Sequence, residues 1–346
     1  MAKVIQVGLG TWGFDWTKQV LPTVASAEMV AYVDSSEAAL ARVQSVLGIP
    51  EAKCFRSLEA ALDAVDADVV LGTLRTEAHF PVAKQALEAG LNVMVEKPFA
   101  STIAEAKTLI EIAQAQGKLL AVSQNYRYFP APILATQLLA EQALGPVDLV
   151  TIAFRQHAPT RGHNYPEMPD PLLADMAIHH FDLMRMVLNA KARRLTSRTW
   201  NPPGSPFTFD PAGVLTIEFD NDTIVSYQGS WMSGGPRTPW SGEWTMDCAE
   251  GDIRWSARNH FDTYWGEDRL ILRRRGETPV EPDLPRLKHI DRAGSFAAMV
   301  EAVDTGKVPP RFPSGVDNLG SLALVAAAIL SARRDGAWVE IDEVLE

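Results

Sequence analysis

The chain has 346 residues and a formal net charge of −11 at pH 7, and 47% of its residues are hydrophobic. It is therefore too long for one hydrophobic core, so we expect two domains, and its negative charge argues against nucleic acid and anionic membranes as partners. The two cysteines, Cys54 and Cys248, are far apart in the sequence and predict neither disulfides nor a zinc site. We expect a cytoplasmic protein without a membrane span, because the sequence shows no signal segment and no apolar run near roughly 18 residues.

Residues 1–125 alternate short, apolar, β-branched runs with longer helical stretches, which is typical of βαβ units around a parallel sheet. The expected strands are 4–7, 29–33, 68–74, 92–95 and 119–123. The expected helices are 38–47, 58–65, 78–89 and 103–116. Gly90 and Gly117 follow the last two helices, where helix-ending glycines belong. This order predicts a Rossmann domain.

The pattern changes after Tyr128, where prolines interrupt the chain and strands then dominate. The expected elements are a helix at 133–143, strands at 147–155, 214–219, 223–230, 243–248 and 269–274, a helix at 174–188, helices at 295–303 and 319–332, and a last strand at 338–341. Residues 220–222, Asp-Asn-Asp, predict a hairpin turn. We therefore expect an α+β domain over 126–346 with a large, mostly antiparallel open sheet, whose helix 315–334 is a candidate to pack back on the first domain.

The segment Gly8-Leu9-Gly10-Thr11-Trp12-Gly13 fits G-x-G-x-x-G and lies between a predicted strand and a predicted helix. Such glycines allow a tight turn and a close backbone approach to a dinucleotide diphosphate. Asp34 ends the next strand 21 residues after Gly13 (34 minus 13), near the ~20 expected of an acid that binds the ribose. Because Ser35 and Ser36 supply no arginine for a 2′-phosphate, NAD is favoured over NADP. The alternative is that Asp34 only caps the next helix.

Glu96-Lys97-Pro98 follows the strand 92–95, which places Lys97 at the carboxyl edge of the sheet, where ligands bind in open α/β folds. A lysine there can donate a hydrogen bond to a substrate oxygen, and burial can lower its pKa enough for proton transfer. Taken alone, this motif is better explained as a surface lysine beside a structural proline.

A second cluster consists of Asp175, His179 and Asp182, which fall within about 60° of one another on a helix. An imidazole beside a carboxylate is a suitable acid and base near neutral pH. Asp182 is expected to form an ion pair with Arg185. A metal site is the rival interpretation, but the sequence identifies no third ligand, and we expect none.

These motifs, in this order, resemble the Gfo/Idh/MocA family of oxidoreductases, named for glucose-fructose oxidoreductase, inositol dehydrogenase and a rhizopine-catabolism protein. The resemblance covers nearly the whole chain and implies that Lys97, Asp175 and His179 are catalytic, that hydride passes at the nicotinamide, and that the substrate is a sugar, inositol or related polyol. Two positions depart from the family pattern: Leu74 replaces a proline and Ala177 replaces a glycine.

The resemblance also implies which residues contact the ligands. For the cofactor these are Gly8, Gly10, Thr11, Trp12, Gly13, Asp34, Ser35, Thr73, Leu74, His79, Glu96, Lys97 and Asn125. For the substrate they are Lys97, Arg127, Asp175 and His179, and His163 and Tyr165 are further candidates because they lie just before the helix that carries Asp175. A packing role at the domain junction is an equally good interpretation of Asn125 and Arg127.

The substrate itself is less well defined by the sequence. Residues 161–166 are a candidate lid, and Arg127, Arg155 or Arg161 is a candidate to bind a carboxylate. Trp231, Trp240 and Trp244 are candidates to stack on a sugar ring, although core packing is the simpler expectation for each.

The family is often dimeric or tetrameric, and the solvent-facing side of the second domain's sheet is the expected interface. Two other functions stay open: an NAD-dependent glycoside hydrolase that uses transient oxidation, and a dinucleotide sensor without turnover.

Overall fold

The computed structural model describes residues 1–157, 165–259 and 267–346. The chain divides into two compact units: Met1–Asn125 with Lys288–Leu319, and Tyr126–Leu287 with Gly320–Glu346. The segment Lys288–Leu319, which the sequence assigned to the second domain, therefore clusters with the first. Side-chain packing explains this correction, because Phe296 of that segment meets the buried ring of Trp16 edge to face, with centroids 6.1 Å apart.

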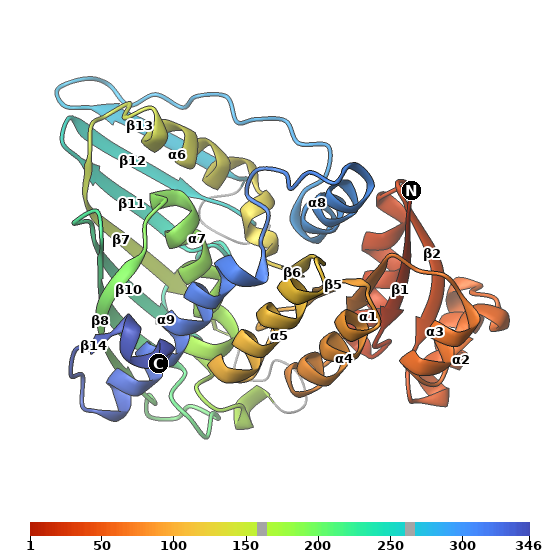
Figure 1. The fold of residues 1–346 in the computed structure, drawn as a ribbon. Helices are drawn as coiled ribbons and strands as arrows, with labels where there is room; N and C mark the ends of the chain where they lie inside the picture. Colours follow the sequence, from red (N-terminus) through yellow and green to blue (C-terminus); the bar gives the residue numbers. More distant parts are fainter. Residues whose placement is uncertain (158–164, 260–266) are drawn as a thin grey trace. The chain divides into compact units, whose positions relative to one another are not determined.

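The first unit is built on a six-stranded parallel sheet in the order β3-β2-β1-β4-β5-β6 (Figure 1). Its strands are β1 (Ala2–Val7), β2 (Ala27–Val33), β3 (Cys54–Phe55), β4 (Val69–Gly72), β5 (Asn92–Val95) and β6 (Leu120–Val122). This strand order is that of a Rossmann domain, in which a dinucleotide binds where the order reverses, next to β1. The expected parallel sheet is thus confirmed, and only the two-residue β3 lacked a sequence signal.

Helices connect these strands as βαβ units require. They are α1 (Thr11–Asp15), α2 (Glu37–Leu47), α3 (Leu58–Ala64), α4 (Thr76–Glu88), α5 (Ile103–Ala115) and, from the returning segment, α8 (Asp291–Thr305). Local chemistry sets their starts: the side chains of Ser36, Ser57 and Thr102 accept hydrogen bonds from backbone N–H groups at the first turns of α2, α3 and α5. A short π-helical segment, Trp16–Val20, continues α1.

The second unit holds an eight-stranded mixed sheet in the order β13-β12-β11-β7-β10-β9-β8-β14. Its strands are β7 (Val147–Arg155), β8 (Ala192–Trp200), β9 (Ala212–Phe219), β10 (Ile224–Ser230), β11 (Glu243–Cys248), β12 (Gly251–Ser256), β13 (Arg269–Arg274) and β14 (Val339–Glu340). Neighbouring strands run antiparallel except β7 and β10. The expected hairpin turn joins β9 to β10, with Asp222 in the left-handed region at φ 64°.

Two strands, β8 and β12, were not expected from the sequence. β8 carries three arginines in nine residues, and β12 begins with Gly251 and Asp252, so neither has a clean β-branched run. Their partners in the sheet stabilise them, because β8 pairs with β9 along its length and β12 is held between β11 and β13.

Two helices, α6 (Pro130–Ala140) and α7 (Ile178–Leu188), lie over one face of this sheet (Figure 1). The expected helix 174–188 is in fact two elements, since a π-helical segment, Leu172–Ala177, precedes α7. The other face exposes a row of side chains, Arg198, Val214 and Gln228, which lie side by side on β8, β9 and β10.

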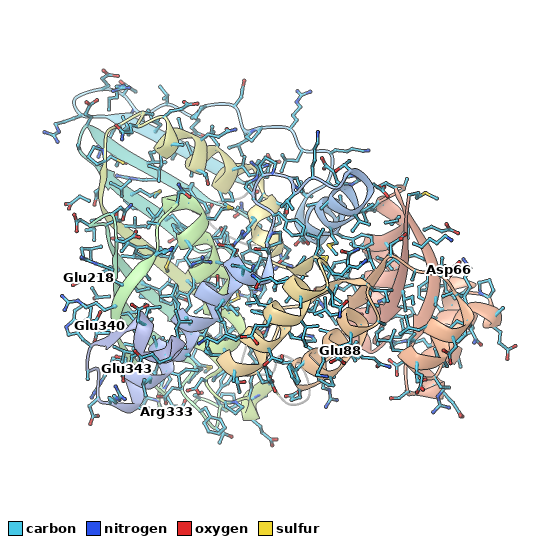
Figure 2. All side chains as sticks on the ribbon, viewed as in Figure 1. Asp66, Glu88, Glu218, Arg333, Glu340 and Glu343 are labelled. Atoms are coloured by element: carbon cyan, nitrogen blue, oxygen red, sulfur yellow. The ribbon has the colours of Figure 1, made fainter. Side chains whose placement is uncertain are left out.

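The last long helix, α9 (Gly315–Arg333), is followed by α10 (Ile341–Leu345). By length and composition α9 is apolar enough to cross a membrane, although the sequence patterns predicted no membrane span. Within the protein, 56% of its most apolar window is buried, as in a core helix. Carboxylates that contribute to the negative charge, among them Asp66, Glu88, Glu340 and Glu343, are exposed (Figure 2).

Candidate active site

The glycine turn between β1 and α1 can be built only with glycine at two of its positions. Gly8 has φ 95°, a conformation that side chains disfavour, and a Cβ on it would lie 2.8 Å from the side chain of Leu74. A Cβ on Gly13 would lie 1.9 Å from the carbonyl oxygen of Gly8. The turn is therefore closed upon itself, and the G-x-G-x-x-G spacing has the structural context that a dinucleotide site requires.

A buried polar network, which no sequence motif indicated, holds this turn in place. The Gln6 amide donates to the Gly13 carbonyl at 2.8 Å and to the Thr73 hydroxyl at 3.0 Å. Thr73 donates to the Gly8 carbonyl at 2.6 Å, and Thr17 donates to the Gln6 amide oxygen at 2.7 Å. Thr73, expected to contact the cofactor, thus also ties the end of β4 to the turn.

Asp34 lies at the end of β2 beside the same turn. Its carboxylate accepts hydrogen bonds from the backbone N–H of Leu9 at 2.6 Å and from that of Ser36 at 2.8 Å. The side chain that caps α2 is Ser36, so capping of α2 is not the role of Asp34. A half-buried carboxylate fixed at the glycine turn is well placed to accept hydrogen bonds from ribose hydroxyls.

Two arginines surround this corner of the site, and neither was identified from the sequence. Arg42 of α2 donates to the carbonyls of Leu9 and Gly10 at 2.8 and 2.9 Å. Arg56, just after β3, donates to the Ser35 carbonyl at 2.5 Å and pairs with Glu37. A guanidinium therefore does lie beside Ser35 and Glu37, close in sequence to Asp34, and it comes from the residue after β3 rather than from the residues that follow Asp34.

The Glu96-Lys97-Pro98 motif continues from β5, as expected. Glu96 is buried and accepts a 2.8 Å hydrogen bond from the Trp16 indole. His79 lies between the Pro98 and Leu74 carbonyls, at 2.8 and 3.2 Å, and burial lowers the pKa of its imidazole. The flanks of Lys97 are thus fixed by buried contacts, while Lys97 itself is half-buried at the carboxyl edge of the sheet.

Asn125, expected to contact the cofactor, donates its side-chain amide to the carboxylate of Asp291 at the start of α8. This contact lies within the first unit and gives Asn125 a structural role beside any role in binding.

In the second unit, Asp175 and His179 lie one turn apart at the junction of the π-helical segment and α7. The Tyr165 hydroxyl donates to the Asp175 carboxylate at 2.8 Å, so Tyr165 contacts a candidate catalytic group directly. His179 is buried and stacks on Tyr126, with ring centroids 4.2 Å apart and planes within 7°. The neighbouring His180 faces the core, between the Tyr227 hydroxyl and the Trp240 carbonyl, and burial lowers its pKa to about 4.

Tyr126 was not identified from the sequence, although it precedes Arg127. Its hydroxyl accepts a 2.8 Å hydrogen bond from Arg258, whose guanidinium also lies 4.9 Å from the Tyr126 ring centroid. Asp268 accepts from the backbone N–H of Arg258 at 2.7 Å, and burial raises the pKa of this carboxyl to about 6. A connected series of contacts therefore fixes the plane of the His179 imidazole.

Asp182 and Arg127 form a buried pair. Arg127 donates to both carboxylate oxygens, with Nε at 2.6 Å, and Ser321 donates to the same carboxylate at 3.1 Å. The expected pair between Asp182 and Arg185 is wrong, because Arg185 donates instead to Ser321. The burial of Arg127 favours the packing interpretation over substrate binding.

The remaining substrate candidates separate by burial. Trp231 and Trp244 are fully buried, the latter stacked on Trp255, so core packing accounts for both; Trp240 is half-buried. Arg155 pairs with Glu243 at 2.5 Å. Arg161 and His163 lie outside the described residues. Among the residues that the structure describes, no group of three or more His, Cys, Asp or Glu side chains is arranged to hold a metal ion.

The fold and these residues define a two-domain oxidoreductase with a Rossmann domain for its dinucleotide. Comparison with known proteins agrees: a family described as "Oxidoreductase family, NAD-binding Rossmann fold" matches residues 2–124, and the "GFO/IDH/MocA C-terminal domain" matches residues 133–254. The chain belongs to the Gfo/Idh/MocA family, and its cofactor is NAD.

Relatives extend over nearly the whole chain. Uncharacterized protein y4oX of Sinorhizobium fredii is 27% identical, covering 99% of this chain and 97% of the relative. D-apiose dehydrogenase of Paraburkholderia graminis is 26% identical, covering 92% and 84%. The structure of an oxidoreductase from Agrobacterium radiobacter, in complex with NAD+, L-tartaric acid and magnesium, has a TM-score of 0.85 at 20% identity and 99% coverage of both chains.

Proposed function

We propose that this oxidoreductase transfers a hydride between the nicotinamide and a secondary alcohol or carbonyl of a sugar, inositol or related polyol, with Lys97, Asp175 and His179 as the catalytic group. The observation that carries the proposal is the setting of His179. Its ring is buried and stacked on Tyr126, one helical turn from the Asp175 carboxylate. An imidazole held in one plane beside a carboxylate is suited to proton transfer. The similarity to a D-apiose dehydrogenase supports a carbohydrate substrate.

Each residue then has a defined part in alcohol oxidation. A bound NAD+ would supply the hydride acceptor for the carbinol carbon, and the hydroxyl proton of the substrate must leave as the carbonyl forms. His179 accepts that proton, and Lys97 donates a hydrogen bond to the substrate oxygen and stabilises its developing negative charge. Asp175 orients the other two groups.

For the cofactor we propose a preference for NAD over NADP, since a 2′-phosphate next to Asp34 would meet a like charge. Arg56 modifies this preference. Its guanidinium is already paired with Glu37, which limits the charge it can offer to a 2′-phosphate.

We also propose that two or four copies assemble through the exposed face of the second unit's sheet, in a reducing, cytoplasmic compartment. The row of Arg198, Val214 and Gln228 on this face includes an apolar side chain, Val214, that is 42% exposed. Both cysteines are free thiols, which suits such a compartment.

The experiment is a screen of NADH production over inositols, aldoses, sugar acids and anhydrosugars, followed by variants on the best substrate. We expect Lys97→Ala and His179→Ala each to lower kcat by about 10²- to 10⁴-fold with NADH affinity mostly retained. Lys84→Ala, which removes an exposed lysine of the same unit, is the matched control and should keep full activity.

The outcomes also separate the alternatives. Turnover of a glycoside with catalytic NAD and no net NADH would indicate the hydrolase. Full activity in both variants would refute the catalytic assignment, and NADH binding without turnover of any substrate would favour the sensor.

A further inference from the structure

The start of α8 brings a second, distant part of the sequence to the glycine turn. Arg292 lies 4.4 Å from the ring centroid of Trp12, the fifth residue of the G-x-G-x-x-G motif, and 5.6 Å from that of Trp16. Its Nη2 also forms a 2.7 Å ion pair with Asp15, at the end of α1. All of these residues belong to the first unit. A guanidinium is thus held against the turn by stacking on one side and by a carboxylate on the other.

The rest of this guanidinium is buried but not hydrogen-bonded. The Arg292 side chain is 13% exposed, and within the described parts of the chain no group accepts a hydrogen bond from its Nε or Nη1. Leaving buried donors of a charged group unsatisfied is costly, so natural proteins rarely keep such an arrangement without a use for it. Asp15 offsets only part of the positive charge, because it is 41% exposed and solvent screens an ion pair with an exposed partner.

The neighbouring arginine is arranged differently. Arg42 uses its Nη2 to bind the carbonyls of Leu9 and Gly10, which fixes the backbone of the turn from the α2 side. Among the described residues, no backbone carbonyl accepts a hydrogen bond from Arg292, which instead lies against the side chain of Trp12, itself 45% exposed. Arg42 therefore has a structural role at the turn and leaves only its buried Nε without an acceptor among the described residues, whereas Arg292 leaves both Nε and Nη1 without one.

We propose that Arg292 is a cofactor-binding residue: its guanidinium supplies positive charge and hydrogen bonds to the diphosphate of the dinucleotide and holds Trp12 in place for the same ligand. This proposal depends on the proposed function in one respect only, namely that the protein binds a dinucleotide. A planar, delocalised cation is the side chain best suited both to stack on an indole and to bind phosphate oxygens. In a chain of net charge −11, a local positive charge also favours binding of an anionic cofactor.

The test measures binding of three ligands by calorimetry to the full-length protein and to Arg292→Gln. NADH and ADP-ribose both carry the diphosphate, whereas AMP lacks it. We expect Arg292→Gln to weaken NADH and ADP-ribose by about tenfold or more, and AMP by less than about twofold. Arg292→Lys, which keeps the charge, should show an intermediate loss and guards against a folding defect in the first variant. The matched control, Lys18→Gln, removes an exposed positive charge from the same unit and should bind all three ligands as the unchanged protein does.

Ionic strength gives an independent readout. If Arg292 acts through its charge, NADH affinity should fall more steeply with added salt in the unchanged protein than in Arg292→Gln. Undiminished ADP-ribose binding in Arg292→Gln, or an equal loss for AMP, would overturn the proposal while leaving the proposed function intact. If the unchanged protein itself bound no NADH, the proposed function would fail as well.

Discussion

The side chain that fixes His179 is Tyr126, an aromatic residue that no catalytic motif contains. Stacked rings 4.2 Å apart restrict rotation of the imidazole, and the hydrogen bond from Arg258 restricts the phenol in turn. If His179 transfers the proton as proposed, Tyr126 controls that group without itself reacting.

Replacing Tyr126 tests this role. Tyr126→Phe keeps the ring and loses only the hydroxyl, so we expect at most about a threefold fall in kcat. Tyr126→Leu removes the stacking partner, and kcat should fall by about tenfold or more with NADH affinity unchanged. The measurement is steady-state kinetics on the best substrate of the screen, together with NADH titration. Equal activity of the two variants would show that the stacked ring does not position His179.

We expect cofactor preference to depend on three residues: Asp34 after β2, Glu37 at the start of α2 and Arg56 just after β3. Asp34→Ala should weaken NAD more than NADP, because the carboxylate attracts ribose hydroxyls and repels a 2′-phosphate. Glu37→Gln should instead raise the use of NADP, since it releases Arg56 from its ion pair. The kcat/KM ratio for the two cofactors measures both effects. The double variant Glu37→Gln with Arg56→Gln is the control, and it should lose the gain in NADP use.

Between elements, the buried pair of Arg127 and Asp182 joins the short 3-10 segment Asn125–Tyr128 to α7, and Ser321 adds α9 to the same carboxylate. Both charged side chains are almost completely buried, at 4% and 1% exposure. Such a pair adds little net stability when intact, but it becomes costly when one partner is removed, because the other charge stays buried.

We therefore expect Asp182→Asn to lower the free energy of unfolding by about 3 kcal/mol or more. Urea denaturation followed by tryptophan fluorescence is the measurement. The double variant Asp182→Asn with Arg127→Met should recover part of the loss, because it removes the stranded charge. If the single and double variants were equally unstable, simple loss of packing would explain the result better.

Over the whole molecule, two buried groups give stability a pH dependence of opposite sign. The folded-state pKa of His180 is about 4, below its ordinary value of 6.5, so the unfolded chain binds the extra proton and stability falls as pH drops through this window. The folded-state pKa of Asp268 is raised from 3.8 to about 6, so the folded chain binds the proton and stability rises over the same drop.

Variants separate the two contributions. His180→Gln should remove a loss of up to about 3 kcal/mol between pH 6.5 and 4 and make the profile flatter. Asp268→Asn should make the fall toward low pH steeper. Urea denaturation at several pH values between 4 and 7 gives both slopes, and a profile unchanged in either variant would contradict the assignment of that group.

Assembly is the other property of the whole molecule that can be tested. Val214→Lys places a charge in the exposed row of the second unit's sheet and should shift the protein toward monomers in light scattering after gel filtration. Val46→Lys is the matched control, because Val46 is similarly exposed, at 60%, but lies on α2 of the first unit. Identical masses for the two variants would exclude this face as the interface.

The sequence by itself determined the parallel Rossmann sheet, the glycine turn with Asp34, and the helical character of the stretch that carries Asp175 and His179, although not its division into a π-helical segment and α7. These features depend on local patterns: β-branched runs, helix-ending glycines, and the spacing of residues along one helix face. Most of the antiparallel sheet was also predictable, whereas β8 and β12 were not, because pairing with neighbouring strands stabilises them in spite of their arginines and glycine.

Only the tertiary structure decided which residues surround those motifs. Arg292 stacks on Trp12, which lies 280 positions earlier in the sequence (292 minus 12). Arg56, just after β3, donates to the Ser35 carbonyl. Asp182 is paired with Arg127 rather than with Arg185. The tertiary structure also shows that Lys288–Leu319 clusters with the first unit. Contacts of this kind depend on packing between distant segments, and packing has no period along the chain from which a pattern could be predicted.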